Sequence, residues 1–219
     1  MTLAGLYHPL VTPFTASGDV DTPAIARNAA AYLSTPLTGL VVLGSNGESP
    51  QLDDDESDRV IEAVREVVPA SRPLLAGAAR ESTRGTIGAC RRAGALGVTA
   101  VMVRTPSFYK NMMTTETFVR HYTEVADASP VPVLLYNVTM YTGVTLHPDA
   151  VGKLSQHPNI VGLKESGNDL QLLATTCPPR RTGSWCSAAP PRRSIRRSRL
   201  ARTAACWHSP ASCPSAART

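Results

Sequence analysis

The sequence predicts a parallel α/β fold that closes as a barrel, and two observations lead to this prediction. Short apolar runs alternate with amphipathic helical segments through about residue 170, which is the order expected of a parallel sheet. Polar side chains also follow several of these runs directly. A barrel collects its ligand-binding residues at such places, because the carboxyl ends of its strands meet at one mouth.

Six apolar runs are expected to be strands, and they are continuous because both faces of such a strand are covered. They span residues 6–11, 39–43, 73–77, 98–103, 131–136 and 160–163. An open doubly wound sheet is the alternative closure. No GxGxxG motif follows the first run and no GxxxxGK[ST] motif occurs, so the common nucleotide-binding open sheets lose support.

Amphipathic segments between the runs are expected to be helices. The clearest span residues 54–68, with an acidic start that suits the positive end of a helix dipole, and residues 114–126. Further helices are expected to begin near Pro23, which fits a first helical position, and near Ser82 or Thr83, which can act as caps.

The composition changes sharply near residue 170. Residues 1–170 hold thirteen basic and seventeen acidic side chains, whereas residues 171–219 hold nine arginines and no acid. We therefore divide the chain into a partial barrel, 1–172, and an Arg/Pro-rich tail, 173–219, in which we expect no strand. The barrel would then stop after about six βα units. The tail is interpreted as a disordered segment or as a frameshifted translation, and the frameshift is favoured because the break falls in mid-architecture.

The broad class follows from what the sequence lacks. It shows no signal-peptide pattern and no apolar stretch long enough for a membrane span, so a cytoplasmic protein without membrane contact is expected. The four cysteines of the tail fit no zinc template, and no metal is expected. The basic tail has no interleaved aromatics, so nucleic acid is not an expected partner.

A glycine-containing turn follows the second apolar run, in the order Gly44, Ser45, Asn46, Gly47, Glu48. Glycine permits a tight turn that exposes backbone N–H groups. Such a turn, with a hydroxyl and an amide side chain, can hold a carboxylate. An ordinary turn that leads into the next helix is the alternative interpretation.

A tyrosine and a lysine end two later runs. Tyr136 would place a phenol at the barrel mouth, where it could relay protons, although a core tyrosine is the alternative. Lys164 directly follows the run 160–163, which is unusual because an ammonium group is costly to desolvate. A dry site favours the neutral amine, whose lone pair can attack a ketone. An ion pair with Glu165, or simple exposure, is the alternative for Lys164.

An anion-binding turn, a phenol and an amine at strand ends are what an imine-forming aldolase needs. Residues 44–48, 136–138 and 162–166 resemble the signature segments of the dihydrodipicolinate synthase/N-acetylneuraminate lyase family, and the resemblance spans about residues 3–172. Within that family, residues 44–48, 121–127 and 155–162 are most similar to 4-hydroxy-2-oxoglutarate aldolases.

The resemblance implies a (β/α)8, or TIM, barrel that forms a Schiff base with pyruvate and needs no metal or organic cofactor. It implies that Lys164 forms the imine and that Tyr136 is the proton shuttle. It also implies a homodimer or homotetramer if the barrel is complete. Tyr109 matches the tyrosine that the family lends across a dimer interface to complete the proton relay.

The substrate carboxylate would be held at the turn after the second strand. The resemblance assigns this role to Ser45, Asn46 and the backbone amides up to Gly47, with Ser45 also joining the proton relay. The expected function is therefore a class I aldolase or lyase that acts on pyruvate or a 4-hydroxy-2-oxo acid.

Two alternatives remain. The first is a catalytically inactive barrel whose first and sixth strands have unpaired edges, with poor solubility as the consequence. The second is a 4-hydroxy-tetrahydrodipicolinate synthase of lysine biosynthesis. It is disfavoured because Tyr141 stands where those synthases carry an arginine.

Overall fold

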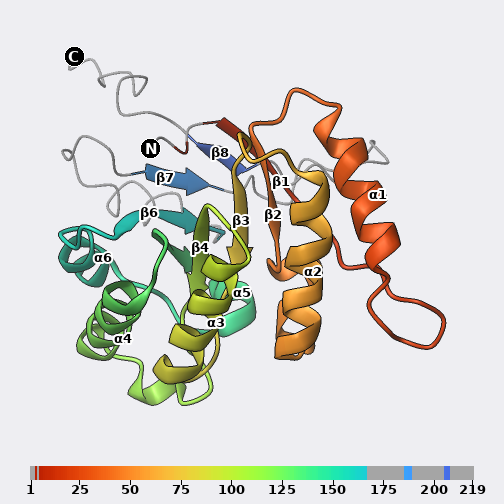
Figure 1. Ribbon diagram of the computed structural model, residues 1–219. Coiled ribbons are helices and arrows are strands. Elements are labelled where there is room, and N and C mark those ends of the chain that lie inside the picture. Colours follow the sequence, from red (N-terminus) through yellow and green to blue (C-terminus); the bar gives the residue numbers. More distant parts are fainter. Residues whose placement is uncertain (1–2, 4, 167–184, 189–204, 208–219) are drawn as a thin grey trace, which may run out of the picture.

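The computed structural model describes residue 3, residues 5–166, residues 185–188 and residues 205–207 of the 219-residue chain. Eight strands form a closed barrel in which each strand lies beside its neighbours in the sequence. Figure 1 shows the helices packed on the outside of these strands, with β7 and β8 completing the ring beside β6 and β1. The predicted α/β barrel is confirmed.

The first six strands form where the apolar runs predict them. They are β1 (Gly5–Pro9), β2 (Gly39–Val42), β3 (Leu74–Gly77), β4 (Ala100–Arg104), β5 (Val133–Asn137) and β6 (Ile160–Glu165). Each of the five pairs from β1·β2 to β5·β6 is parallel. Six parallel strands therefore make up the larger part of the ring, as the count of βα units predicts.

Two short strands close the ring. β7 (Trp185–Ala188) pairs parallel to β6, and β8 (Ala205–Trp207) pairs antiparallel to both β7 and β1. The expectation that residues 173–219 contain no strand is wrong for these two segments, and so is the expectation of unpaired edges on β1 and β6. A ladder is made by backbone N–H and C=O groups, so segments of unremarkable composition can pair with free edges.

The remaining residues of the segment 173–219 lie outside the described part of the chain. The predictions that this segment is a disordered or frameshifted tail therefore stay predictions.

The helices connect the strands on the outside of the barrel. They are α1 (Thr22–Leu33), α2 (Asp54–Val67), α3 (Thr83–Ala95), α4 (Thr115–Ala128), α5 (Thr139–Thr142) and α6 (Pro148–Leu154), with 3-10 turns η1 (Ser45–Gly47), η2 (Ser49–Gln51) and η3 (Lys110–Met112). Ser82 caps α3 through the N–H of Gly85, and Asp53 and Glu56 form a capping box on α2. No helix in the described part of the chain is long and apolar enough to cross a bilayer.

Strand alternation divides the core into two layers. Inside the barrel, one buried cluster includes Val41, Leu75, Met102 and Leu134. Outside, between strands and helices, a larger cluster takes the neighbouring strand residues, such as Leu135. Full burial of one such side chain is worth about 1.5–3 kcal/mol. The inner cluster forms an apolar floor, and the side chains one layer further toward the carboxyl ends lie above it.

Candidate active site

Three polar side chains lie in one row at the carboxyl ends of β4, β5 and β6. Arg104 is the register partner of Tyr136, and Tyr136 is the register partner of Lys164. Paired residues of parallel strands share a face, so all three side chains point to the same side as Met102 and Leu134, two residues before Arg104 and Tyr136. The row therefore lies at the barrel mouth, directly above the apolar floor.

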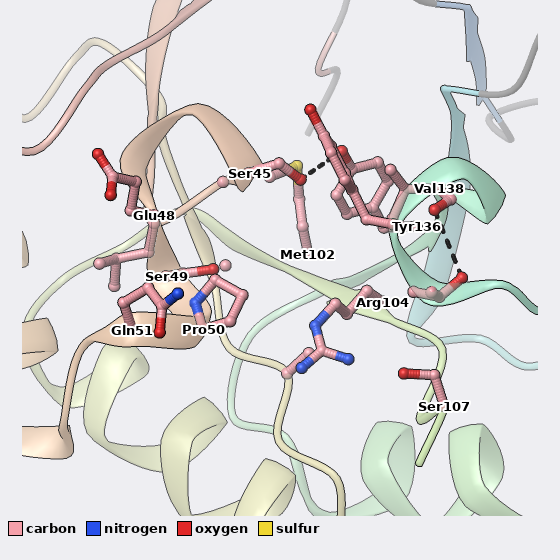
Figure 2. Close-up of a pocket in the computed structure, with 16 residues that line it drawn as sticks. Ser45, Glu48, Ser49, Pro50, Gln51, Met102, Arg104, Ser107, Tyr136 and Val138 are labelled. Atoms are coloured by element: carbon pink, nitrogen blue, oxygen red, sulfur yellow. Dashed lines mark hydrogen bonds between the residues drawn. The ribbon is translucent and has the colours of Figure 1, made fainter. Parts of the chain in front are cut away.

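Lys164, Tyr136 and Ser45 lie next to one another. The Nζ atom of Lys164 lies over the ring of Tyr136, 4.1 Å from its centroid, and the Tyr136 hydroxyl lies 3.0 Å from the Ser45 hydroxyl (Figure 2 shows the latter pair). Lys164 is only 7% exposed and Tyr136 only 6%. The amine is thus held out of bulk water against an aromatic face, which attracts its positive charge.

A cavity of about 440 Å³ opens beside this row. Its lining comes from the ends of β2 to β5 and the loops that follow them: Leu43, Gly44, Ser45, Glu48, Ser49, Pro50, Gln51, Gly77, Ala79, Met102, Arg104, Ser107, Tyr136, Val138, Tyr141 and Thr142. Among the described residues, the lining includes Tyr136 but not Lys164. The Lys164 amine nevertheless lies close to a lining residue, since its Nζ atom is 4.1 Å from the ring centroid of Tyr136.

The turn after β2 is shaped by unusual backbone conformations. Leu43 and Glu48 adopt positive φ values of 54° and 55°, which are rare for residues with a side chain. Gly77 at the end of β3 permits this turn, because a Cβ there would overlap the carbonyl oxygen of Leu43. Strained backbone of this kind costs about 1–3 kcal/mol per residue and is concentrated at functional sites. The turn brings the Ser45 side chain to the cavity wall.

Three residues that the family resemblance assigns to the site are not among the residues that line the cavity. Asn46 is exposed, and Gly47 is buried with its carbonyl accepting a hydrogen bond from Thr12 Oγ1 at 2.7 Å. Tyr109 is 69% exposed and lies edge-on to Phe108. None of the three lines the cavity. Their roles in binding and proton relay stay predictions.

A charged pair that the sequence analysis missed lies at the cavity. The Nη1 atom of Arg104 donates to Glu81 Oε1 at 2.9 Å, and the other Glu81 oxygen accepts from the backbone N–H groups of Ser107 and Phe108. Burial raises the pKa of Glu81, but these hydrogen bonds and the Arg104 charge together hold that pKa below its usual range. Arg104 directly follows the apolar run 98–103, the same signal that singles out Lys164.

The next residue of each strand faces the opposite way. Asn137 donates from Nδ2 to Glu165 Oε2 at 2.6 Å and accepts from the Leu146 N–H at 3.0 Å. Asn137 and Glu165 are 0% and 3% exposed. Glu165 therefore belongs to a buried network behind the strands, on the other face from Lys164.

Metal-ligating side chains are dispersed in this structure. In the part of the chain that the structure describes, no three His, Cys, Asp or Glu side chains come together as a group that could hold a metal ion.

The fold and the pocket define an α/β-barrel protein with a cavity at the carboxyl ends of β2 to β5, the end at which such barrels bind their ligands. The family model described as "Dihydrodipicolinate synthetase family" matches residues 2–183. The chain belongs to the dihydrodipicolinate synthetase family.

Curated proteins with related sequences match most of this chain but only about half of their own length. The chain is 39% identical over 165 residues to a protein of Emericella nidulans named "Probable 4-hydroxy-2-oxoglutarate aldolase, mitochondrial", covering 73% of this chain and 53% of that protein. It is 37% identical over 170 residues to a 4-hydroxy-tetrahydrodipicolinate synthase of an Exiguobacterium species, covering 78% and 57%. The chain therefore spans a little over half the length of these curated relatives.

A solved structure extends the comparison to three dimensions. A prophage protein of the dihydrodipicolinic acid synthase family from E. coli, crystallised in complex with pyruvate, superimposes with a TM-score of 0.76 at 29% identity. The match covers 80% of this chain and 59% of that one.

Proposed function

We propose that this protein is a class I aldolase or lyase that forms a Schiff base between Lys164 and a small 2-oxo acid, either pyruvate or a 4-hydroxy-2-oxo acid. The observation that carries the proposal is the buried amine of Lys164, held 4.1 Å from the ring centroid of Tyr136. The aldolase and synthase names of the relatives support it, as does the pyruvate bound to the related E. coli protein.

The chemistry begins at the lysine amine. The neutral Nζ of Lys164 attacks the C2 ketone, and loss of water from the adduct with uptake of one proton leaves a protonated imine. In the cleavage direction the C3–C4 bond breaks and its electron pair moves into the imine, which acts as the electron sink. Imine formation requires the ketone carbon to come within bonding distance of Nζ, which packs against the Tyr136 ring 4.1 Å from its centroid.

Tyr136 and Ser45 would move the proton. As the C3–C4 bond breaks, the C4 hydroxyl must lose its proton, which the oxygen of the lining residue Tyr136 would accept as its own phenolic proton moves to Ser45. The Ser45 hydroxyl, 3.0 Å from the Tyr136 oxygen, would pass the proton on. The same path in reverse supplies a proton to the alkoxide during bond formation.

The substrate carboxylate would bind at the turn after β2. Ser45 lines the cavity and can donate its hydroxyl directly. A contribution from Asn46 or Gly47, as the family resemblance implies, requires the turn to shift, since neither lines the cavity.

A second copy of the chain is proposed to complete the relay through Tyr109. Phe108, Tyr109 and Met112 are 76%, 69% and 67% exposed on the segment after β4, which is unusual for large apolar side chains close together in sequence. A homodimer or homotetramer would cover them. Sedimentation velocity of the wild type and of Tyr109→Ser tests this, and a monomeric wild type at micromolar concentration contradicts it.

Borohydride reduction in the presence of pyruvate tests the proposed function. The chain holds three lysines, and we expect a stable pyruvate adduct on Lys164 alone, located by peptide mass. Lys164→Met should abolish the adduct, whereas the exposed Lys153→Met should retain it. An unmodified Lys164, or a label confined to Lys110 or Lys153, overturns the proposal.

An inactive barrel is the second candidate. Two observations favour it: Lys164 does not line the cavity, and the chain spans little more than half of its curated relatives. It predicts no adduct on Lys164 at any pyruvate concentration. Synthase activity in lysine biosynthesis is less favoured, because Tyr141 rather than an arginine lines the cavity at that position.

A further inference from the structure

Arg104 is the one basic side chain among the described residues that line the cavity. It ends β4 in the same inward row as Tyr136 and Lys164. Figure 2 shows its guanidinium within the group of lining residues, between Ser107 and the turn that carries Gln51. A fixed positive charge at this place raises the affinity of the cavity for an anion.

The guanidinium of Arg104 has N–H donors that are not used by any described residue. Only Nη1 is engaged, by Glu81 Oε1 at 2.9 Å and by the carbonyl of Thr105 at 3.2 Å. Among the described residues, Nε and Nη2 of Arg104 have no hydrogen-bond partner. A guanidinium offers a planar fork of N–H groups that matches the two oxygens of a carboxylate. Most N–H donors of Arg104 are therefore available to a ligand.

Glu81 positions this arginine without occupying the cavity itself. Its carboxylate binds Arg104 through one oxygen and fixes the backbone N–H groups of Ser107 and Phe108 with the other. The Arg104 side chain is only 19% exposed, so its conformation is set before any ligand arrives. An anion that binds there loses little further side-chain entropy.

The distance between Arg104 and Lys164 determines which part of a bound substrate lies near Arg104. Neighbouring strands lie about 4.8 Å apart, so two strand spacings separate the arginine from the amine, with Tyr136 between them. A substrate attached to Lys164 through C2, with its first carboxylate toward Ser45, would extend its far end along this row. That far end would reach the open side of the guanidinium.

We propose that Arg104 binds a second carboxylate at the end of the substrate remote from the 2-oxo group, and that Glu81 is its positioning residue. The inference rests on the proposed function, since it uses Lys164 as the point of attachment. It narrows the substrate class to 2-oxo acids with two carboxylates and predicts weaker binding of neutral-ended analogues. The acidic lining residue Glu48 does not oppose this, because Figure 2 shows it well separated from Arg104.

The test compares two ligands of equal chain length, 2-oxoglutarate and 2-oxopentanoate, which differ in the distal carboxylate. Each is trapped on Lys164 by borohydride over a range of concentrations, and the half-saturating concentration is read from intact mass. The wild type should prefer 2-oxoglutarate by about 10- to 100-fold, the range expected for charge-assisted hydrogen bonds. Arg104→Gln should lose this preference while trapping pyruvate as the wild type does.

Two further variants distinguish the positioning role of Glu81 from a general effect of positive charge on the protein. Glu81→Gln should reduce the preference several-fold and leave pyruvate trapping unchanged, because the guanidinium loses its anchor and the amine does not. Arg120→Gln removes a charge from an 85% exposed arginine on α4 and should keep the full preference.

The outcomes are distinct. Equal half-saturation of the two ligands in the wild type, or an unchanged preference in Arg104→Gln, overturns the inference while pyruvate trapping still supports the proposed function. If pyruvate is not trapped at all, the proposed function fails. The anion site is then decided by titration calorimetry of both ligands with the wild type and Arg104→Gln, where equal affinities overturn it.

Discussion

The two faces of the sheet at the ends of β4, β5 and β6 differ in how their polar groups are used. The inward row is Arg104, Tyr136 and Lys164, and the outward row, one residue later in the sequence in each case, is Thr105, Asn137 and Glu165. Both rows are largely buried, but the outward row faces the helices and the inward row faces the barrel mouth.

This difference separates polar groups that stabilise the fold from polar groups that remain available to bind a ligand. Asn137 donates to Glu165 and accepts from the Leu146 N–H, so both polar atoms of its amide are bonded within the protein. Arg104 retains open N–H groups, and the Tyr136 hydroxyl faces the cavity. Substitutions in the inward row should therefore change activity, and those in the outward row should change stability.

The largest effect is expected from Tyr136→Phe. Removal of the phenolic hydroxyl takes away the proposed proton carrier, and turnover should fall by about 10²–10⁴-fold. Stability should change little, since the ring that packs against Lys164 remains. Steady-state kinetics and urea unfolding measure the two quantities. A variant with near wild-type turnover would remove Tyr136 from the mechanism.

Asn137→Ala should have the largest effect on stability. It removes the hydrogen bond to buried Glu165 and takes the acceptor from the buried Leu146 N–H, at a combined cost of about 4 kcal/mol. Urea unfolding measures the loss, and Asn111→Ala, at an exposed position, is the matched control with little expected change. Equal stability of both variants would contradict a structural role for the outward row.

The helix layer behind the outward row should make the protein sensitive to acid. Burial lowers the pKa of His121 to about 4 from an ordinary value of 6.5, partly offset by the charge of Glu81. Between these two pH values the unfolded chain binds a proton that the folded protein does not, so stability falls as the pH falls. The loss from this residue approaches roughly 3 kcal/mol near pH 4.

His121→Gln provides the check, because glutamine can keep a hydrogen bond to Thr83 but cannot titrate. The free energy of unfolding of this variant should vary less between pH 7 and pH 4 than that of the wild type. The exposed His147→Gln should keep the wild-type slope. Parallel slopes in wild type and His121→Gln would show that another group causes the acid loss.

The smallest effect is expected at Thr105. Its side chain is fully buried and, among the described residues, its hydroxyl has no hydrogen-bond partner. Thr105→Val keeps the shape and removes the buried polar group, so stability should rise by about 1 kcal/mol. Thermal unfolding would detect this, and a clear destabilisation would mean that the hydroxyl has a partner in solution.

Much of the fold could be predicted because strand and helix signals are local. Continuous apolar runs located six strands, and the cap at Ser82 marked the start of α3. The two closing strands were missed because Trp185–Ala188 and Ala205–Trp207 are short, and their pairing depends on edges of β6 and β1 that lie far away in the sequence.

Part of the candidate site could also be predicted, because a polar residue at the end of an apolar run is a local signal. Lys164 and Tyr136 stand out as polar residues at strand ends, but Arg104 carries the same signal and was overlooked. Glu81 carried no such signal, because its importance comes from Arg104, Ser107 and Phe108, more than twenty positions later in the sequence.

The sequence by itself determined which residues end the strands and, through strand alternation, that Lys164 and Glu165 face opposite sides. Only the tertiary structure decided the register that places Arg104, Tyr136 and Lys164 side by side, and the packing of the Lys164 amine against the Tyr136 ring. The physical reason is that alternation is set within one strand, whereas register and side-chain stacking are set by packing between strands distant in sequence.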